Sequence, residues 1–243
     1  MKKINPKEYI AVLSLWKRGQ YLEEQLECLR LQSAPPKEIW LCWGVNGENK
    51  DFEGTDLYKK FDKVYKVEDG GSCCSRYEMC KQDEDQYFLV LDDDMFPTGN
   101  YMERCVTFIE KNGEHQIGCS GRIFAGKEYF PNRAVGSWNY HNLDTFVHIG
   151  TNGHFITNHA VNCLLEHHDF GDVWGDDIAL GLYNWHHRKV STVVVAQDSG
   201  CNADKYKHER GCDDAALSKV DTQPEFYRER NKLLARCLEL INE

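Results

Sequence analysis

Alternating apolar and polar segments divide the first hundred residues into strand, helix, strand, strand, helix and strand. The apolar segments typical of strands are residues 9–15, 38–45, 62–67 and 87–91. Between the first two, Leu22, Leu26 and Leu29 recur at helical spacing within residues 21–32, and a second helix is predicted over residues 75–81. Strands connected by helices in this order favour right-handed crossovers. The pattern therefore predicts an α/β fold with a mostly parallel central sheet flanked by helices.

The rest of the chain is predicted to extend the same domain. Helices are predicted over residues 100–111, 176–185 and 224–240, and strands over residues 117–124, 146–149, 154–156 and 192–196. The aromatic, turn-rich stretch over residues 130–142 indicates no particular element. Because no repeat, low-complexity segment or linker interrupts the chain, we expect residues 1–243 to form a single domain.

Composition narrows the class of protein. Hydrophobic residues make up 41% of the chain and aromatic residues 12%, enough to fill a core, so disorder is not expected. The net charge of −10 and the absence of a long basic run argue against a nucleic-acid partner. Eleven cysteines without Cys-x-x-Cys spacing predict buried free thiols in a reducing compartment.

Two further features bear on location. The chain has no apolar stretch of about 18 residues, the length that predicts a transmembrane helix. Its start, Met1-Lys2-Lys3, continues into polar residues rather than into the apolar segment of a signal peptide. We therefore expect a cytoplasmic protein without a membrane span, and the sequence leaves its oligomeric state open.

Three consecutive aspartates, Asp92, Asp93 and Asp94, follow the apolar run of residues 87–91, and we call them the acidic tip. Ligands of α/β folds gather at the carboxyl ends of strands. Neighbouring carboxylates repel one another but suit Mg²⁺ or Mn²⁺, which prefer oxygen ligands and bridge to phosphates. Strand geometry turns Asp92 and Asp94 to one side. The tip predicts a metal–diphosphate site, with Asp94 on the metal and Asp92 on a ribose or a metal-bound water; the alternative is a surface turn.

A second acidic constellation, Asp176-Asp177, follows Trp174-Gly175 and opens a predicted helix; we call it the acid pair. Aspartates are favoured in the first turn of a helix by its free N–H groups, which is one explanation of the pair. The indole of Trp174 offers a flat apolar platform for a sugar face. A carboxylate beside such a platform can act as a general base toward an attacking hydroxyl.

Taken in order along residues 8–200, these features resemble the nucleotide-sugar glycosyltransferases of the GT-A fold, especially the inverting family 2. The resemblance rests on an apolar strand ending in Asp-x-Asp, on Pro97 and a helix led by Tyr101, and on the later acid pair in its Trp-Gly context. It implies a GT-A, Rossmann-like domain. Residues 1–98 would bind the nucleotide sugar, residues 99–200 the acceptor, and residues 201–243 would add a loop and a helix.

The resemblance also implies roles for particular residues. Mn²⁺ or Mg²⁺ and the donor, a nucleoside-diphosphate sugar, would be held by the acidic tip, with Asp92 and Asp94 as metal ligands, and Asp177 would be the catalytic base. The expected neighbours of the nucleotide or diphosphate are Ser14, Trp16, Asp69, Arg76 and Asp93. Two departures from the family pattern are Asp176, where Glu is frequent, and a C-terminal acceptor signature that is not recognisable.

Histidines give weaker indications. His208 lies among Lys205, Lys207 and Arg210 in a predicted loop that could close over the diphosphate, with His208 as a further metal ligand; a solvated loop is the alternative. His154 lies in the half expected to bind the carbohydrate acceptor, with Trp174 and Asp176. The remaining histidines show no His-Glu-x-x-His zinc spacing and are expected to be hydrogen-bonding or surface residues.

Several functional alternatives stay open. A retaining GT-A enzyme would share the metal site without the base. A sugar-nucleotide pyrophosphorylase would be expected to carry a Gly-rich, Arg-containing loop after the first strand, whereas residues 14–19 hold one glycine. An inactive carbohydrate-binding homologue would not require both acidic constellations. UDP is the expected nucleotide of the donor by family frequency, while the sugar and the acceptor are undetermined.

Overall fold

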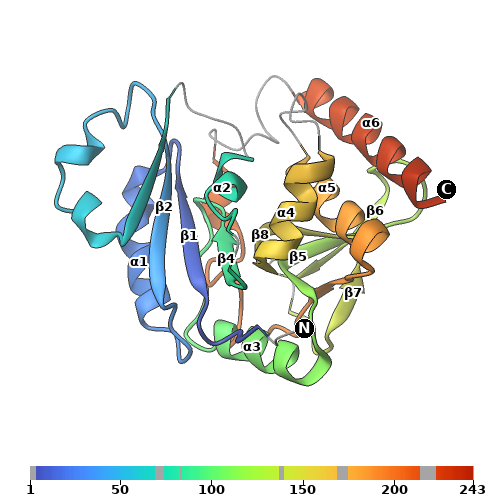
Figure 1. Ribbon diagram of the computed structural model, residues 1–243, viewed down its shortest axis with the longest axis horizontal. Coiled ribbons are helices and arrows are strands. Elements are labelled where there is room, and N and C mark those ends of the chain that lie inside the picture. Colours follow the sequence, from blue (N-terminus) through green and yellow to red (C-terminus); the bar gives the residue numbers. More distant parts are fainter. Residues whose placement is uncertain are drawn as a thin grey trace.

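A nine-stranded sheet runs through the centre of the computed structural model, with helices packed on both faces (Figure 1). The structure describes residues 4–68, 74–82, 84–136, 140–168, 175–213 and 223–242. Strand order is β3-β2-β1-β4-β8-β5-β9-β7, and β6 pairs with β5. The predicted single α/β domain with a helix-flanked central sheet is confirmed.

The first four strands are parallel, as their apolar segments predicted. They are β1 (Ile10–Leu15), β2 (Glu38–Gly44), β3 (Lys63–Val67) and β4 (Tyr87–Leu91). Helix α1 (Leu22–Arg30) connects β1 to β2, and the short α2 (Ser75–Glu78) precedes β4. Because β1 and β4 are adjacent and parallel, the residues that follow them meet at one edge of the sheet.

The second half makes the sheet mixed. Its strands are β5 (Gln116–Phe124), β6 (Asn132–Gly136), β7 (Thr145–Val147), β8 (Ile149–Thr157) and β9 (Thr192–Val194). Its helices are α3 (Tyr101–Asn112), α4 (Asn158–His167), α5 (Asp176–Tyr183) and α6 (Gln223–Asn242). Strand β8 lies antiparallel between β4 and β5, and β9 is parallel to β5.

Some local predictions for this half were wrong. The strands predicted over residues 146–149 and 154–156 are replaced by β7 and by one continuous β8. Polar and glycine residues at 150–153 interrupt the apolar alternation of β8, but its neighbours β4 and β5 supply its hydrogen bonds. Strand β6 and helix α4 were not predicted; α4 begins after Thr157, whose side chain accepts a hydrogen bond from Ala160 N at 3.2 Å.

The sheet separates two apolar cores. On one side, Leu13 of β1 packs with buried residues of α1 and α3, and on the other, Val12 packs with residues of α2, α4, α5 and α6. Neighbouring residues of β1 thus face opposite cores, as the two-residue repeat of a strand requires. Helix α6 belongs to the second core through Leu233, Leu234 and Cys237.

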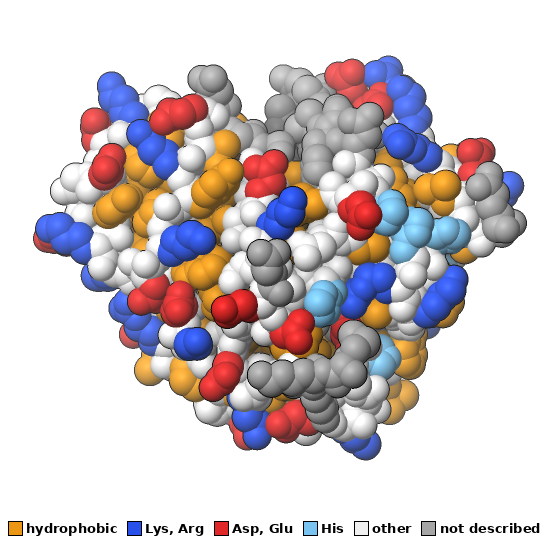
Figure 2. Space-filling view, viewed as in Figure 1, with side chains coloured by type: hydrophobic (Ala, Val, Ile, Leu, Met, Phe, Trp, Pro, Cys, Tyr) orange, Lys and Arg blue, Asp and Glu red, His pale blue; other side chains and the backbone are white. Residues whose placement is uncertain are grey.

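The predicted burial of the cysteine thiols can be checked in the structure. The ten described cysteines are free and, except for Cys212, buried. Burial raises the pKa of the Cys119 thiol to about 12, so it stays neutral at physiological pH. In the described ranges, no helix combines the length and apolar character needed to cross a membrane. Figure 2 shows acidic and basic side chains interspersed over one face, with histidines gathered at its right.

Candidate functional site

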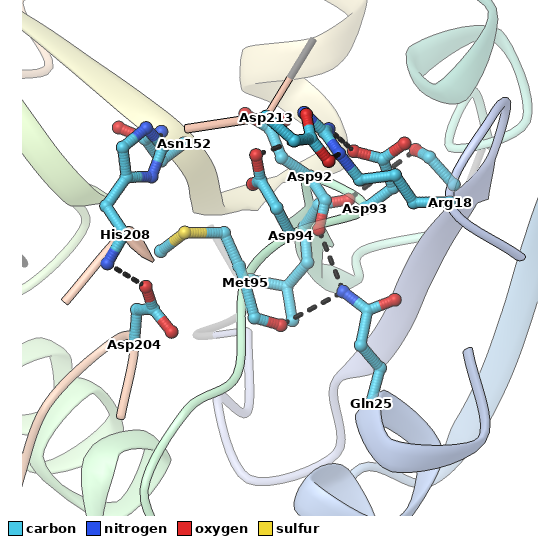
Figure 3. A network of polar contacts seen from close by, with 12 residues as sticks. Arg18, Gln25, Asp92, Asp93, Asp94, Met95, Asn152, Asp204, His208 and Asp213 are labelled. Carbon is cyan, nitrogen blue, oxygen red and sulfur yellow. Dashed lines mark hydrogen bonds and ion pairs between the residues drawn. The ribbon is translucent and has the colours of Figure 1, made fainter. Parts of the chain in front are cut away.

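The acidic tip lies where β4 ends, and its backbone is held by neighbouring elements. Gln25 of α1 donates from Nε2 to the carbonyl oxygens of Asp92 (2.9 Å) and Met95 (3.0 Å) (Figure 3). On the other side, Asn152 of β8 has a left-handed backbone with φ of 68°, and its carbonyl accepts from Asp92 N at 3.4 Å. The shape of the tip is therefore set by α1 and β8 as well as by β4.

Arg18, which follows β1, is the main cation at the tip. Its side chain is buried, and Nη1 lies 2.5 Å from Asp93 Oδ1 and 3.3 Å from Asp94 Oδ2. Nε and Nη2 of the same guanidinium donate to the two carboxylate oxygens of Asp213 at 2.9 and 2.7 Å (Figure 3). Burial opposes the charge of Arg18, but Asp213 and the tip raise its pKa above the ordinary value. Arg18 thus joins three carboxylates from two segments far apart in sequence.

Asp94 is the least satisfied carboxylate of the tip. It is 6% exposed, and among the described residues its Oδ1 has no hydrogen-bond partner. Burial, and after it the charges of Asp92 and Asp93, raise the pKa of Asp94 to about 8. A buried carboxylate oxygen without a donor is the kind of group that a bound cation satisfies.

A small space beside Asp94 is kept open by a glycine. A Cβ added at Gly211 would lie 2.3 Å from Asp94 Oδ2 and 2.7 Å from His208 Cε1, and we call this space the Gly211 cradle. His208 also approaches Asn152, whose Nδ2 lies 3.4 Å from His208 Nδ1 (Figure 3). Carboxylate oxygen and imidazole nitrogen around one cradle are donors that Mn²⁺ accepts. In the described part of the chain, however, no three acidic, histidine or cysteine side chains already surround a common metal position.

His208 is carried by a tightly turned loop. The buried carboxylate of Asp204 accepts from Tyr206 N at 3.1 Å and from His208 N, and Lys207 and His208 have φ of 50° and 67°. Positive φ at such residues is uncommon and is often found at functional sites. Burial raises the pKa of Asp204 to about 6 against the hydrogen bonds that it accepts.

Lys205 and Arg210, which the sequence places around His208, pair with Glu24 of α1 instead of facing the acidic tip. Lys205 Nζ lies 2.7 Å from Glu24 Oε1, and Arg210 Nη1 lies 3.5 Å from Glu24 Oε2. Arg210 also covers the rings of Tyr21 and Tyr206. These contacts fasten the loop to α1, so that His208 faces the tip while Lys205 and Arg210 act as its anchors.

A cleft of about 320 Å³ lies along the same loop. It is lined by Tyr21, Tyr206, Glu209, Arg210, Cys212 and Asp213. Because Asp213 also pairs with Arg18, the cleft borders the acidic tip rather than containing it. The buried carboxylates and Arg18 lie at the tip, and the cleft adjoins them through Asp213.

Arg76 brings the two acidic constellations together. Its Nη1 donates to Asp92 Oδ1, and its Nη2 donates to Asp176 Oδ2 at 2.8 Å. Burial alone would raise the pKa of Asp176, but Arg76 holds it below the ordinary value. One guanidinium from α2 therefore links the end of β4 with the start of α5, the two places where the sequence has its acidic constellations.

Asp177, the other member of the acid pair, is held by the C-terminal helix. Its Oδ1 accepts from Ile178 N at 2.9 Å, and its Oδ2 accepts from Arg230 Nη2 at 2.7 Å. The expected base therefore has a partner that the sequence analysis missed. The signal was confined to one arginine within the apolar pattern of the tail helix.

The remaining expected residues fall into three groups. Ser14 lies beside the end of β4, with Oγ 3.5 Å from Leu91 O, and Trp16, directly after β1, is 38% exposed. His154, expected near an acceptor, is 1% exposed, and its Nδ1 lies 3.0 Å from the hydroxyl of the buried Tyr77. Asp69 and Trp174 lie outside the described residues.

Comparison with known proteins identifies the fold. No protein-family profile and no curated protein matches the chain. Among solved structures, S. aureus TarS 1–349 in complex with UDP-GlcNAc aligns with a TM-score of 0.60 and 13% identity, over 96% of this chain and 70% of that one. TarS 1–349 alone gives 0.58 and 12%, covering 96% and 71%.

The longer TarS structure aligns with a TM-score of 0.50 and 12% identity, over 87% of this chain and 43% of its own length. The chain has the fold of TarS. At such low identity the likeness concerns the fold alone, and the roles of the residues at the tip depend on their own geometry.

Proposed function

We propose that this protein is a metal-dependent glycosyltransferase that moves a sugar from a UDP-sugar to a hydroxyl group of a glycan or another acceptor, with inversion. The observation that carries the proposal is the Arg76 bridge between Asp92 of the acidic tip and Asp176 of the acid pair. It joins carboxylates suited to a cation with a carboxylate pair suited to proton transfer. A fold shared with TarS, which was solved with UDP-GlcNAc, supports a nucleotide sugar as donor.

On the donor side, Asp94, Asp92 and His208 would hold Mn²⁺ or Mg²⁺ against the diphosphate. When bound, the cation stabilises the negative charge that develops on the departing nucleotide. Arg18 adds positive charge here, because phosphate oxygens can replace the carboxylate of Asp213 in its bidentate contact. Arg76 is the second cation within reach.

The nucleoside would lie against the end of β1. Trp16 is exposed there and offers a flat face for a base, and Ser14 borders the same edge. Asp93, which shares Nη1 of Arg18 with Asp94, and Asp69 complete the expected set of donor contacts. Nothing in the geometry of these residues selects the sugar.

On the acceptor side, Asp177 would accept the proton of the attacking hydroxyl while that oxygen bonds to the anomeric carbon from the face opposite the diphosphate. A single displacement of this kind inverts the anomeric centre. Asp176, fixed by Arg76, would keep the pair at the edge of the donor site. Trp174 and Asp176 remain the expected neighbours of the acceptor, whereas His154 is buried against the hydroxyl of Tyr77 and does not reach the surface.

The proposal is tested by incubating the protein with UDP-, GDP- and dTDP-sugars, Mn²⁺ and a panel of glycans. Release of nucleoside diphosphate with a product of inverted anomeric configuration, followed by NMR, is the expected result. A retained configuration points to a retaining enzyme, pyrophosphate-dependent formation of nucleoside triphosphate to a pyrophosphorylase, and binding without turnover to a carbohydrate-binding homologue.

A matched pair of variants makes the test specific. Asp94→Asn removes a proposed metal ligand, whereas Asp56→Asn changes an acid whose side chain is 94% exposed. The proposal expects Mn²⁺-dependent release of nucleoside diphosphate to be lost in the first variant and kept in the second. Equal activity of both variants would refute the role of the acidic tip.

A further inference from the structure

The C-terminal helix α6 supplies a buried cation to the acid pair. Arg230 is 5% exposed, and its Nη2 donates to Asp177 Oδ2 at 2.7 Å. A charged group is expensive to bury, and a buried ion pair is weak evidence for a role in stability, because apolar residues of similar size often serve as well. The position of this arginine therefore calls for an explanation in terms of what it does to Asp177.

Aromatic rings hold the guanidinium of Arg230 in place beside the carboxylate of Asp177. Its guanidinium lies 4.4 Å from the ring centroid of Tyr129 and 5.2 Å from that of Phe226. The next residue, Asn231, accepts a hydrogen bond from Tyr129 N through its Oδ1 at 2.6 Å. Burial opposes the charge of Arg230, but Asp177 and Tyr129 raise its pKa above the ordinary value, so the guanidinium stays charged.

A second contact from the same helix reaches the turn that presents the acid pair. Gly175, directly before Asp176, has φ of 146°, and a Cβ added there would lie 2.5 Å from Leu233 Cδ2. Leu233 is 1% exposed and packs in the core beneath α5. Helix α6 therefore controls both the backbone that leads into the pair and the side chain of its second member.

We propose that Arg230 is a positioning residue that fixes the carboxylate of Asp177 for proton transfer; this rests on the function proposed above. An ionised carboxylate has about four acceptor positions, and the bonds from Ile178 and Arg230 occupy one on each oxygen of Asp177. The two bonds determine the rotation of the carboxylate and leave positions for an acceptor hydroxyl. Misplacing a reacting group by about 1 Å can cost about 100-fold in rate.

The test compares Arg230→Met with Arg230→Lys and with Asn231→Ala. The alanine variant loses an anchor of α6 on the neighbouring residue but leaves the contact with Asp177 intact, so it controls for loosening of the helix. Thermal unfolding of each variant sets an assay temperature at which all are folded. We expect kcat to fall about 100-fold in Arg230→Met with an unchanged KM for the donor, to recover partly in Arg230→Lys, and to stay near wild type in Asn231→Ala.

The double variant Asp177→Asn/Arg230→Met keeps the test valid if Arg230→Met unfolds, because it leaves no unpaired buried charge. Its kcat should equal that of Asp177→Asn alone, since the arginine acts only through the aspartate. Equal losses in Arg230→Met and Asn231→Ala, or a loss confined to KM, would overturn the positioning role while leaving the glycosyltransferase proposal intact. A wild-type protein that turns over no nucleotide sugar would remove both.

Discussion

Replacing Gly211 with alanine tests whether the cradle beside Asp94 is a binding site. The new methyl group would lie 2.3 Å from Asp94 Oδ2, whereas ordinary contact begins at 3.4 Å, so the carboxylate or the loop has to move by roughly 1 Å. Overpacking of this size costs about 1–3 kcal/mol of folding free energy. It should cost more in function, since Mg²⁺ requires near-ideal ligand distances and a 1 Å displacement of a reacting group reduces rates by about 100-fold.

The assay is titration calorimetry with Mn²⁺ in the presence of UDP, together with release of UDP from the donor. Gly200→Ala is the matched control, because a Cβ at this nearby glycine would meet its first neighbour, Asp198 Oδ1, at 3.5 Å. We expect the control to bind and react like wild type and Gly211→Ala to lose about 100-fold in kcat/KM. If both variants bind Mn²⁺ and UDP with wild-type affinity and turn over normally, the cradle is not the cation site.

Three other predictions concern the tip and the buried network behind it. Asp94→Asn should abolish Mn²⁺-dependent UDP binding in calorimetry without lowering the melting temperature of the metal-free protein at neutral pH, because the raised pKa of about 8 keeps the Asp94 carboxyl mostly protonated there and asparagine replaces a neutral group of the same size; a lower melting temperature would contradict this. Arg76→Gln should raise the KM for the donor by about 10-fold or more, since it removes the cation shared by Asp92 and Asp176, and unchanged donor kinetics would count against the bridge. Burial, and after it the charge of Arg76, lowers the pKa of His154 in the folded protein. Below pH about 6.5 the unfolded state therefore binds more protons than the folded state. The free energy of unfolding should then fall as pH falls, by up to about 1.4 kcal/mol per pH unit. Urea unfolding between pH 5 and 7.5 (a range set about the ordinary histidine pKa) should show a weaker pH dependence in His154→Gln, and equal slopes would exclude His154 as the source.

Local patterns predicted the parts of the site that belong to regular elements. The apolar run of residues 87–91 is β4, and the acidic tip follows it as expected. The acid pair opens α5 as its first two residues. In each case an element with a clear repeat ends or begins next to the polar group, so the position of the group follows from the element.

The residues that connect these parts were not predictable in the same way. Arg18 meets Asp213 across 195 positions, and Arg230 meets Asp177 across 53. Ion pairs at such separations leave no periodic pattern in the sequence, and an isolated arginine reads as a surface cation. The role of Gly211 was not predictable either, because it depends on the side chains of Asp94 and His208 that lie against it in the folded structure.

The side-chain amide of Gln25 has a wider consequence for how the domain tolerates change. It holds two carbonyl groups of the turn between Asp92 and Met95, so the conformation of this turn depends on a helix that lies 67 to 70 positions earlier in the chain. Leucine at this position would keep the apolar face of α1 and its packing, yet the carbonyl of Met95 would lose its donor Gln25, and that of Asp92 would keep only the bond from Met95 N at 3.2 Å. A protein changed in this way would retain its fold while the turn that carries the proposed cation site lost its defined shape, so that a substitution in α1 could abolish the proposed activity without unfolding the molecule.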